Sequence, residues 1–312
     1  MIRGFFKNAL PASKVVFSIF IILCVFLVVL LAGTLIAVPL FGVSIFQLPG
    51  ILSDFNNPKT VVLLKYFQTI QSLGLFVIPP FLIGYFYSEN KSTAYLKLDR
   101  QPLYFSIILI AVLMFCVIPF INLLGEVNSW MKLPHFLASV ENWMKSSEDN
   151  AQRLTQTFLR GSSIGVLLVN IFVVALIPAV GEEMVFRGIF QRLFTEWTKS
   201  IHWGVIISAA FFSFMHFEFY GFLPRMVLGI LLGYLFVWSD TLWLPIIAHF
   251  FNNGIAVVCT FLWNNKFIST DPDKFQTTPS SLFIAALSLI LAITLLHSIF
   301  LHEQKARFQQ EL

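Results

Sequence analysis

This chain of 312 residues is 57% hydrophobic and only 12% charged, and its mean hydropathy is +0.82. Charged residues make up roughly a quarter of an ordinary soluble domain, so the composition excludes that class and predicts a protein that crosses a membrane several times. The net charge of +4 comes without a basic cluster on a soluble domain, which makes nucleic acid an unexpected partner.

Apolar runs long enough to cross about 30 Å of hydrocarbon predict eight spans within one domain, residues 1–312. In chain order the predicted helices cover residues 15–38, 61–87, 102–124, 164–194, 203–219, 222–238, 242–263 and 280–301. The predicted fold class is therefore an all-α, polytopic transmembrane bundle of about eight spans. The short piece from Phe41 to Ile51 contains Gly42, Pro49 and Gly50, which favours a turn at the membrane interface.

Lysine and arginine in short loops predict the orientation, because these residues are enriched on the cytoplasmic side. Cations precede the first span, follow the second and the fourth, and end the chain: Arg3, Lys7, Lys14, Lys91, Lys97, Arg100, Arg187, Arg192, Lys199, Lys305 and Arg307. An even number of spans puts all of them on one side. We therefore expect an integral protein of the bacterial inner (plasma) membrane with both termini cytoplasmic, and with Glu182 toward the cytoplasmic end of the fourth span.

The long segment at 125–163 is predicted to hold an amphipathic helix that lies in the membrane interface. Apolar residues recur there at helical spacing, while charged residues occupy the rest of the circumference: Phe136, Val140, Trp143 and Met144 against Lys132, Glu141 and Lys145. We expect a surface helix that covers the ends of the bundle rather than a gate for substrate.

Two adjacent carboxylates and an arginine end the fourth apolar run, in the sequence Gly181-Glu182-Glu183-Met184-Val185-Phe186-Arg187-Gly188. An ionisable residue within a membrane span is costly and by default marks a functional site. Glu183 and Arg187 are four residues apart and can pair on one helical face, whereas Glu182 points about 100° away. We therefore expect a structural pair between Glu183 and Arg187, with Glu182 left free for chemistry.

Two later spans also carry polar residues among apolar ones. His216 ends the run Phe212-Ser213-Phe214-Met215, and His249 and Asn253 are four residues apart on one helical face. Polar groups on several spans usually converge on an interior cavity.

Two kinds of chemistry fit these residues. Glu182 as a general base, with His216 orienting the water or relaying its proton, would activate water, and His249 and Asn253 would offer donors to an oxyanion. Alternatively, Glu182, His216 and His249 would bind a divalent metal such as zinc. The spacing alone does not decide between them.

Most of these residues also have a purely structural interpretation. A lone histidine such as His216, or an asparagine such as Asn253, often only bonds a neighbouring helix. Arg225 lies near a predicted helix margin, where its charge can snorkel to the surface. Glu182 is hardest to explain structurally, because the nearest cation, Arg187, is already expected to pair with Glu183. The conjunction of three helices, rather than any one residue, favours a site.

The chain resembles the CPBP family, which includes the CAAX prenyl endopeptidases and the bacterial Abi or bacteriocin-immunity-type membrane proteins. The resemblance lies in three motifs in the family's order: Glu182-Glu183-x-x-x-Arg187 with Gly188, then Phe212-x-x-x-His216, then His249-x-x-x-Asn253. It covers residues 164–260, which would form the catalytic core of the membrane-embedded domain.

This resemblance implies an intramembrane endopeptidase with an all-helical core that opens toward the cytosol and the inner leaflet. It implies that Glu182 and His216 activate water and that His249 and Asn253 stabilise the oxyanion. It also implies that the pair of Glu183 and Arg187 is structural. It leaves glutamate-based and metalloprotease-like chemistry both open. The expected partners are the lipid bilayer and a membrane-associated peptide or protein substrate.

Two other classes of function stay open. A non-proteolytic immunity or partner-binding membrane protein would keep the polar site as a structural network. A transporter with an intramembrane carboxylate relay is a weaker alternative, because the sequence shows neither inverted repeats nor paired broken helices.

Overall fold

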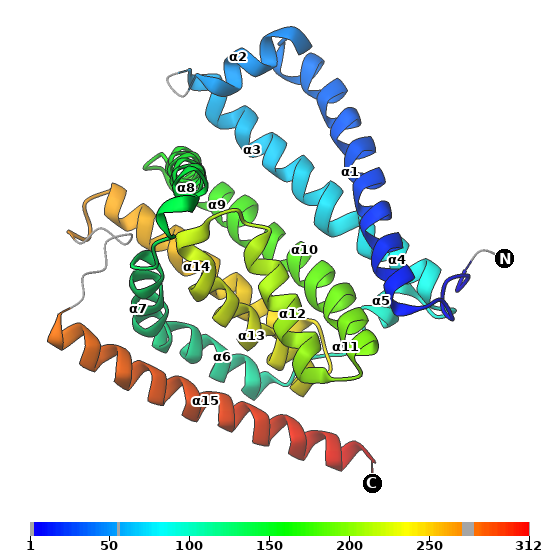
Figure 1. Cartoon of the computed structure of the whole chain (residues 1–312). Coiled ribbons are helices and arrows are strands. Elements are labelled where there is room, and N and C mark those ends of the chain that lie inside the picture. The colour runs from blue at the N-terminus through cyan, green and yellow to red at the C-terminus, as the bar shows by residue number, and fades with distance from the viewer. Residues whose placement is uncertain (1–2, 55–56, 270–277, 312) are drawn as a thin grey trace.

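The computed structural model describes residues 3–54, 57–269 and 278–311, and this part of the chain is helical without any strand (Figure 1). Six helices are long and apolar enough to cross a membrane, and one bent helix pair makes a seventh. A shorter apolar helix of 14 residues accounts for the eighth predicted segment. The prediction of an all-α membrane bundle is confirmed.

The first two spans form a hairpin. α1 (Pro11–Phe41) leads through η1 (Ile45–Gln47) and α2 (Leu48–Ser53) into a second span made of α3 (Pro58–Ser72), the π turn η2 (Leu73–Val77) and α4 (Ile78–Tyr87). The predicted interfacial turn thus contains two short helical pieces. α5 (Ser92–Tyr95) follows the second span.

The third predicted span is divided into α6 (Tyr104–Cys116) and α7 (Ile118–Ser129), which are bent by 44° relative to each other. Pro119 lies in the first turn of α7. A proline has no N–H to continue the preceding helix, and its ring clashes with the preceding turn. The bend therefore has a local cause in the sequence.

The fourth span is one continuous stretch of 35 residues, Ile164–Thr198, built from five pieces. These are α9 (Ile164–Asn170), the π turn η4 (Ile171–Leu176), α10 (Ile177–Val185), the π turn η5 (Phe186–Gln191) and α11 (Arg192–Thr198). Single π turns inside helices are frequently found at functional sites. Both of these turns flank α10, which carries the two adjacent glutamates.

The C-terminal part of the bundle comprises α12 (Ile201–Phe214), η6 (Phe219–Gly221), α13 (Phe222–Ser239), α14 (Trp243–Asn264) and α15 (Pro279–Glu311). α12 and α13 form a closely packed hairpin, because a Cβ atom added at Gly229 would lie only 3.0 Å from the Cβ of Ala209. Small residues allow such close approach between helices in membranes. α12 ends before His216, so this histidine lies in the turn of the hairpin.

The apolar core joins these helices in two main clusters. One contains side chains of α6, α13, α14 and α15, such as Ile110, Leu232 and Leu244. The other joins α4 and α10 to the segment around the start of α14 through Ile83, Met184 and similar residues. A smaller cluster packs Val185 and Phe186 of the fourth span against Phe212 of α12. The fourth span, which carries the two adjacent glutamates, therefore lies against both α12 and α14.

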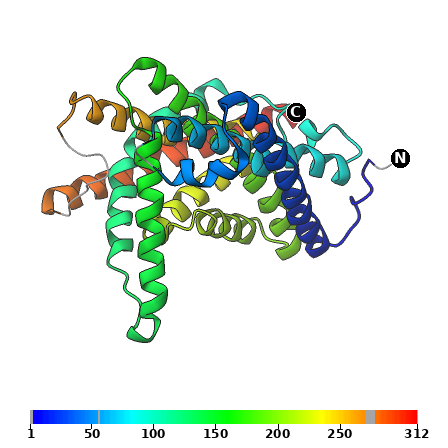
Figure 2. The same cartoon turned by 90° about the horizontal axis from the view of Figure 1, so that it is seen from above.

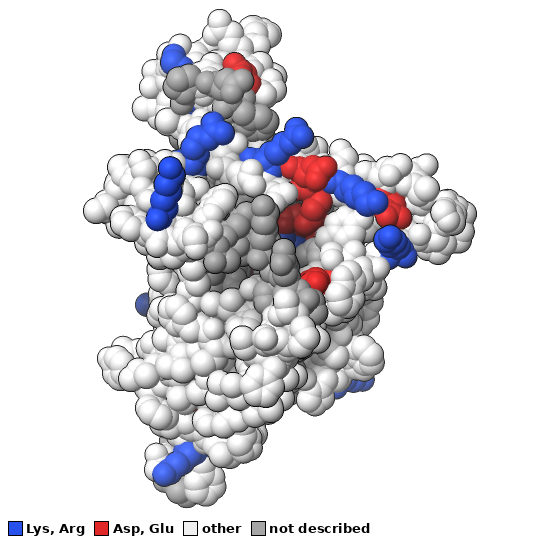
Figure 3. Space-filling model, turned by 90° about the vertical axis from the view of Figure 1, so that its left-hand side faces the viewer, with Lys and Arg blue, Asp and Glu red and all other residues white. Residues whose placement is uncertain are grey.

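The segment at 125–163 contains α8 (Ala138–Phe158), preceded by η3 (His135–Leu137), which confirms the predicted helix. α8 appears end-on in Figure 1 and lengthwise in Figure 2, so it crosses the direction of α15 rather than running along it. The start of α1 and the end of α15 lie to the right in Figure 1, and α8 lies to the left. Figure 3 shows charges of both signs gathered in the upper part of that left-hand face, above a largely uncharged surface.

Candidate active site

Three elements bring the predicted catalytic residues together. The Oε2 atom of Glu182, on α10, lies 4.0 Å from Nε2 of His216 in the α12–α13 turn. The same oxygen lies 3.9 Å from Nε2 of His249 on α14. The side chains of Glu182 and His216 are 14% and 30% exposed, so both are reachable from a cavity. The side chains of the three motifs thus lie together, and the catalytic roles predicted for them stay predictions.

The proton positions at both imidazoles follow from their partners. Nδ1 of His216 lies 2.9 Å from the carbonyl oxygen of Phe212, and Nδ1 of His249 lies 2.8 Å from Oε1 of Glu183. A carbonyl or a carboxylate only accepts, so each Nδ1 carries a proton. In the neutral imidazole Nε2 is then an acceptor, and both Nε2 atoms face Glu182, which is also an acceptor. These neighbouring acceptors can bind a group that has two hydrogen-bond donors.

Glu183 and Arg187 form the buried pair that the spacing predicted. Nη1 of Arg187 donates to Oε1 of Glu183 at 2.7 Å, and the two side chains are 1% and 0% exposed. Nη2 of Arg187 donates to the Gly229 carbonyl at 3.0 Å, and the guanidinium carbon lies 4.9 Å from the ring centroid of Phe212. The pair thus connects α10, α12 and α13 and also holds His249 through Glu183.

Asn253 is placed by a gap in the backbone bonding of the fourth span. Pro178 has no N–H to donate to the carbonyl of Val174, four residues earlier. Nδ2 of Asn253 lies 3.4 Å from that carbonyl oxygen, and its Oδ1 accepts from Nδ2 of Asn252 at 3.1 Å. The Nδ2 group has two N–H donors, so one remains to serve a ligand.

These side chains line a cavity of about 430 Å³. Its walls include polar residues that the sequence analysis did not select: Gln68, Gln71, Glu218, Arg225 and Asn252. Gln68 and Gln71 are three residues apart in an apolar span, a spacing that shares one helical face and that was visible in the sequence. The interpretation of Arg225 as a snorkelling margin residue was incomplete, because Arg225 pairs with Glu218 in the cavity wall.

The cavity also reaches α8, which contributes Ala151, Leu154, Thr155 and Phe158 to its wall. α8 lies toward the end of the bundle opposite the start of α1 and the end of α15 (Figure 1). The resemblance implies a site that opens toward the cytosol, and the loop charges predict cytoplasmic termini. The side toward which the site opens and the side of the termini stay predictions.

The predicted metal was compared with the donors present. Among the side chains that the structure describes, no group of three or more His, Cys, Asp or Glu residues is arranged to hold a metal ion. The zinc alternative, with Glu182, His216 and His249 as ligands, therefore stays a prediction from residue types, and we derive no step through a metal.

Comparison with known proteins was made for the whole chain. A family model described as type II CAAX prenyl endopeptidase Rce1-like matches residues 164–255, under a third of the chain, and this stretch contains all the motif residues. The uncharacterized protein YpbD of Bacillus subtilis (strain 168) is 29% identical over 90 residues, which cover 28% of this chain and 43% of that protein. The chain thus spans less than half the length of this curated relative. No solved structure matches significantly. The segment at 164–255 therefore matches the Rce1-like family model, which confirms the resemblance that the three motifs predicted.

Proposed function

We propose that this protein is an intramembrane endopeptidase that hydrolyses a peptide bond with a water molecule activated by Glu182 and His216. The observation that carries the proposal is the pair of acceptors, Oε2 of Glu182 and Nε2 of His216, 4.0 Å apart. A water that donates to both at a usual distance of about 2.8 Å would subtend an angle of about 90°. That angle is near the water's own geometry, so the two acceptors can hold and orient it.

The reaction follows from these positions. Glu182 takes a proton from the water as general base, and the water oxygen forms a bond to the carbonyl carbon of the substrate. The carbonyl electron pair moves to its oxygen and gives a tetrahedral intermediate. The intermediate re-forms the carbonyl and breaks the C–N bond, and the proton held by Glu182 passes to the leaving amine. His216 keeps the water in line and shares the proton through Nε2.

The developing oxyanion would meet His249 and Asn253. The free N–H of Asn253 donates directly, and His249 donates from Nε2 when its ring is protonated. Glu183 orients that ring, because its carboxylate accepts from Nδ1 of His249 at 2.8 Å. Arg187 in turn holds the Glu183 carboxylate in place.

The cavity wall supports a peptide as the substrate. A peptide inside a membrane must have its backbone N–H and C=O groups satisfied by protein. The cavity offers Gln68, Gln71 and Asn252 for this purpose, beside apolar surface from Phe76 and Phe158. A membrane-associated peptide, or a segment of a membrane protein, is the substrate class that fits this mixture.

The test compares the membrane proteomes of cells that carry the wild-type chain, the Glu182→Gln variant or the Glu89→Gln variant. Glu89 is a matched control, because its side chain is 70% exposed on a loop and it takes no part in the cavity. New peptide N-termini are identified by mass spectrometry. We expect termini that require the wild-type chain, persist with Glu89→Gln and vanish with Glu182→Gln, although thermal unfolding in detergent is unchanged. Equal termini from the wild type and Glu182→Gln would refute the proposed protease and favour the partner-binding alternative.

A further inference from the structure

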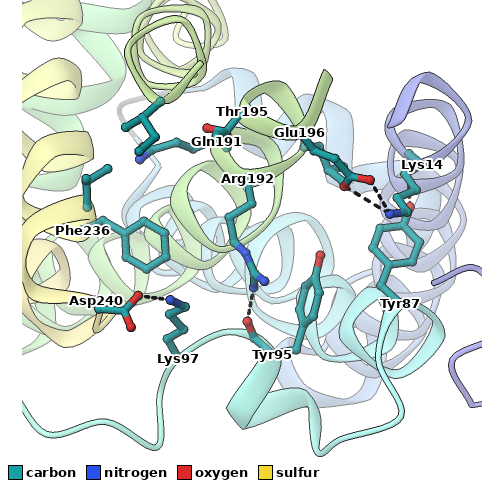
Figure 4. Close-up of a pocket in the computed structure, with 13 residues that line it drawn as sticks. Lys14, Tyr87, Tyr95, Lys97, Gln191, Arg192, Thr195, Glu196, Phe236 and Asp240 are labelled. Carbon is teal, nitrogen blue, oxygen red and sulfur yellow. Dashed lines mark hydrogen bonds and ion pairs between the residues drawn. The ribbon is translucent and has the colours of Figure 1, made fainter. Parts of the chain in front are cut away.

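A second cavity, of about 540 Å³, lies between the start of α1, α5, α11 and the end of α13 (Figure 4). It shares no lining residue with the candidate active site. Gln191 in its wall follows Glu182 by nine residues on the same continuous helix, which corresponds to about 13 Å at 1.5 Å per residue. The cavity lies where spans end, at the level of lipid headgroups.

The charges around this cavity do not cancel. Lys14 is paired with Glu196, its Nζ lying 2.9 and 3.1 Å from the two carboxylate oxygens. Asp240, by contrast, contacts two cations, Lys97 and Arg100. Among the described residues no carboxylate lies within ion-pairing distance of Arg192, which also lines the cavity. The lysines and arginines that line the cavity thus outnumber its carboxylates, with Lys14, Lys97 and Arg192 against Glu196 and Asp240.

Arg192 is held in place without using up its donors. Its guanidinium carbon lies 4.2 Å from the ring centroid of Tyr95, and Nη1 donates to the Tyr95 carbonyl. A guanidinium has five N–H donors, so most of them stay available. Figure 4 shows Arg192 between the Lys14–Glu196 pair and the Lys97–Asp240 pair. A fixed planar fork of donors with surplus positive charge is the arrangement that binds phosphate.

We propose that this cavity binds a phosphate group, either in the headgroup of an anionic lipid or as free phosphate. Arg192 and Lys97 would contact the phosphate oxygens. Cationic clusters at the ends of membrane spans attract anionic headgroups. The inference concerns binding alone and does not depend on the proposed protease activity.

The test uses the full chain purified in detergent and titrated with phosphatidylglycerol or with phosphatidylcholine, with bound lipid counted by native mass spectrometry. We expect tighter binding of phosphatidylglycerol to the wild type, and binding weakened about tenfold or more in Arg192→Gln, because hydrogen bonds to charged groups are strong. Lys305→Gln is the matched control: Lys305 is an exposed cation of α15 outside the cavity, and its loss should leave binding unchanged.

Arg192 also bonds the Tyr95 carbonyl, so thermal unfolding is measured in parallel. Lys97→Gln provides a second variant, which should weaken phosphatidylglycerol binding in the same direction. Added inorganic phosphate separates the two sources. Displacement of phosphatidylglycerol by phosphate, lost in Arg192→Gln, identifies free phosphate as a ligand, whereas resistance to phosphate identifies the lipid. Equal binding of the two lipids by the wild type together with no binding of inorganic phosphate, or equal effects of Arg192→Gln and Lys305→Gln, would overturn the proposal.

Discussion

The buried pair between Glu183 and Arg187 allows a quantitative prediction for the Arg187→Met variant. Arg187 is 1% exposed and Glu183 is fully buried. The substitution therefore leaves the Glu183 carboxylate inside the bundle with Nδ1 of His249 as its remaining side-chain hydrogen-bond donor among the described residues. Breaking a buried ion pair by removing one partner typically costs about 3–5 kcal/mol. A folded domain has a total stability of about 5–15 kcal/mol. We therefore expect a large loss of folded protein.

The double variant Arg187→Met/Glu183→Gln separates this reasoning from simple loss of packing. Replacement of a whole buried pair by uncharged groups often changes the free energy of unfolding very little. The double variant should therefore unfold at a higher denaturant concentration than Arg187→Met. Unfolding is followed in detergent by titration with denaturant. Lys145→Met is the matched control, since Lys145 and Glu141 have the same spacing and a contact of 2.8 Å but lie at the surface, where such pairs contribute little. An Arg187→Met variant within about 1 kcal/mol of the wild type would refute the structural role assigned to the pair.

Two further predictions concern the cavity wall. Pro178→Ala restores an N–H that competes with Asn253 for the Val174 carbonyl, so cleavage should slow about three- to tenfold without loss of thermal stability; an unchanged rate would separate Asn253 from the reaction. On α8, burial raises the pKa of Glu148 above its ordinary range, beside the N–H of Tyr220 and near Arg225 and Asp149. The pKa of Glu148 is higher when α8 is docked than when α8 is released, so the docked form binds more protons. Docking of α8 therefore strengthens as pH falls between the pKa of the docked form and that of the released form, and it weakens as pH rises. Limited proteolysis of α8 should therefore slow at mildly acidic pH, and Glu148→Gln should abolish that pH dependence.

Much of the fold could be predicted from the sequence because membrane spans leave a strong signal in composition. Each of the eight predicted segments contains helix, and the i to i+4 spacing alone predicts the pair of Glu183 and Arg187. The bend between α6 and α7 was missed, although Pro119 stood in the span. The early end of α12 was also missed, because Phe217 adopts a positive φ of 53° that no local residue type predicts.

The candidate site was only partly predictable, for a physical reason. Glu182, His216, His249 and Asn253 stand out as polar residues on apolar spans, so their types and order suffice to select them. Asn252 and the wall residues of α8 reach the cavity because of how helices far apart in the sequence are placed. The hydrophobic periodicity of a sequence does not contain that information. Arg225 gave a signal, but a charge near a helix end is compatible with the surface as well as with a cavity until its partner Glu218 is located.

The two π turns that flank α10 have a consequence for how this helix can vary between related chains. A π turn holds one residue more than an α turn, so the fourth span can lose or gain a single residue at η4 or η5 and still remain a helix. The loss of the extra residue turns the π turn into an α turn and leaves the helix on either side facing nearly the same way. Because η5 contains Arg187, the spacing within Glu182, Glu183 and Arg187 stays intact when the change in η5 falls after Arg187. Single-residue gaps in an alignment are therefore to be expected at these turns. The half of the helix that carries Gln191 and Arg192 can then diverge in evolution separately from the half that carries the glutamates.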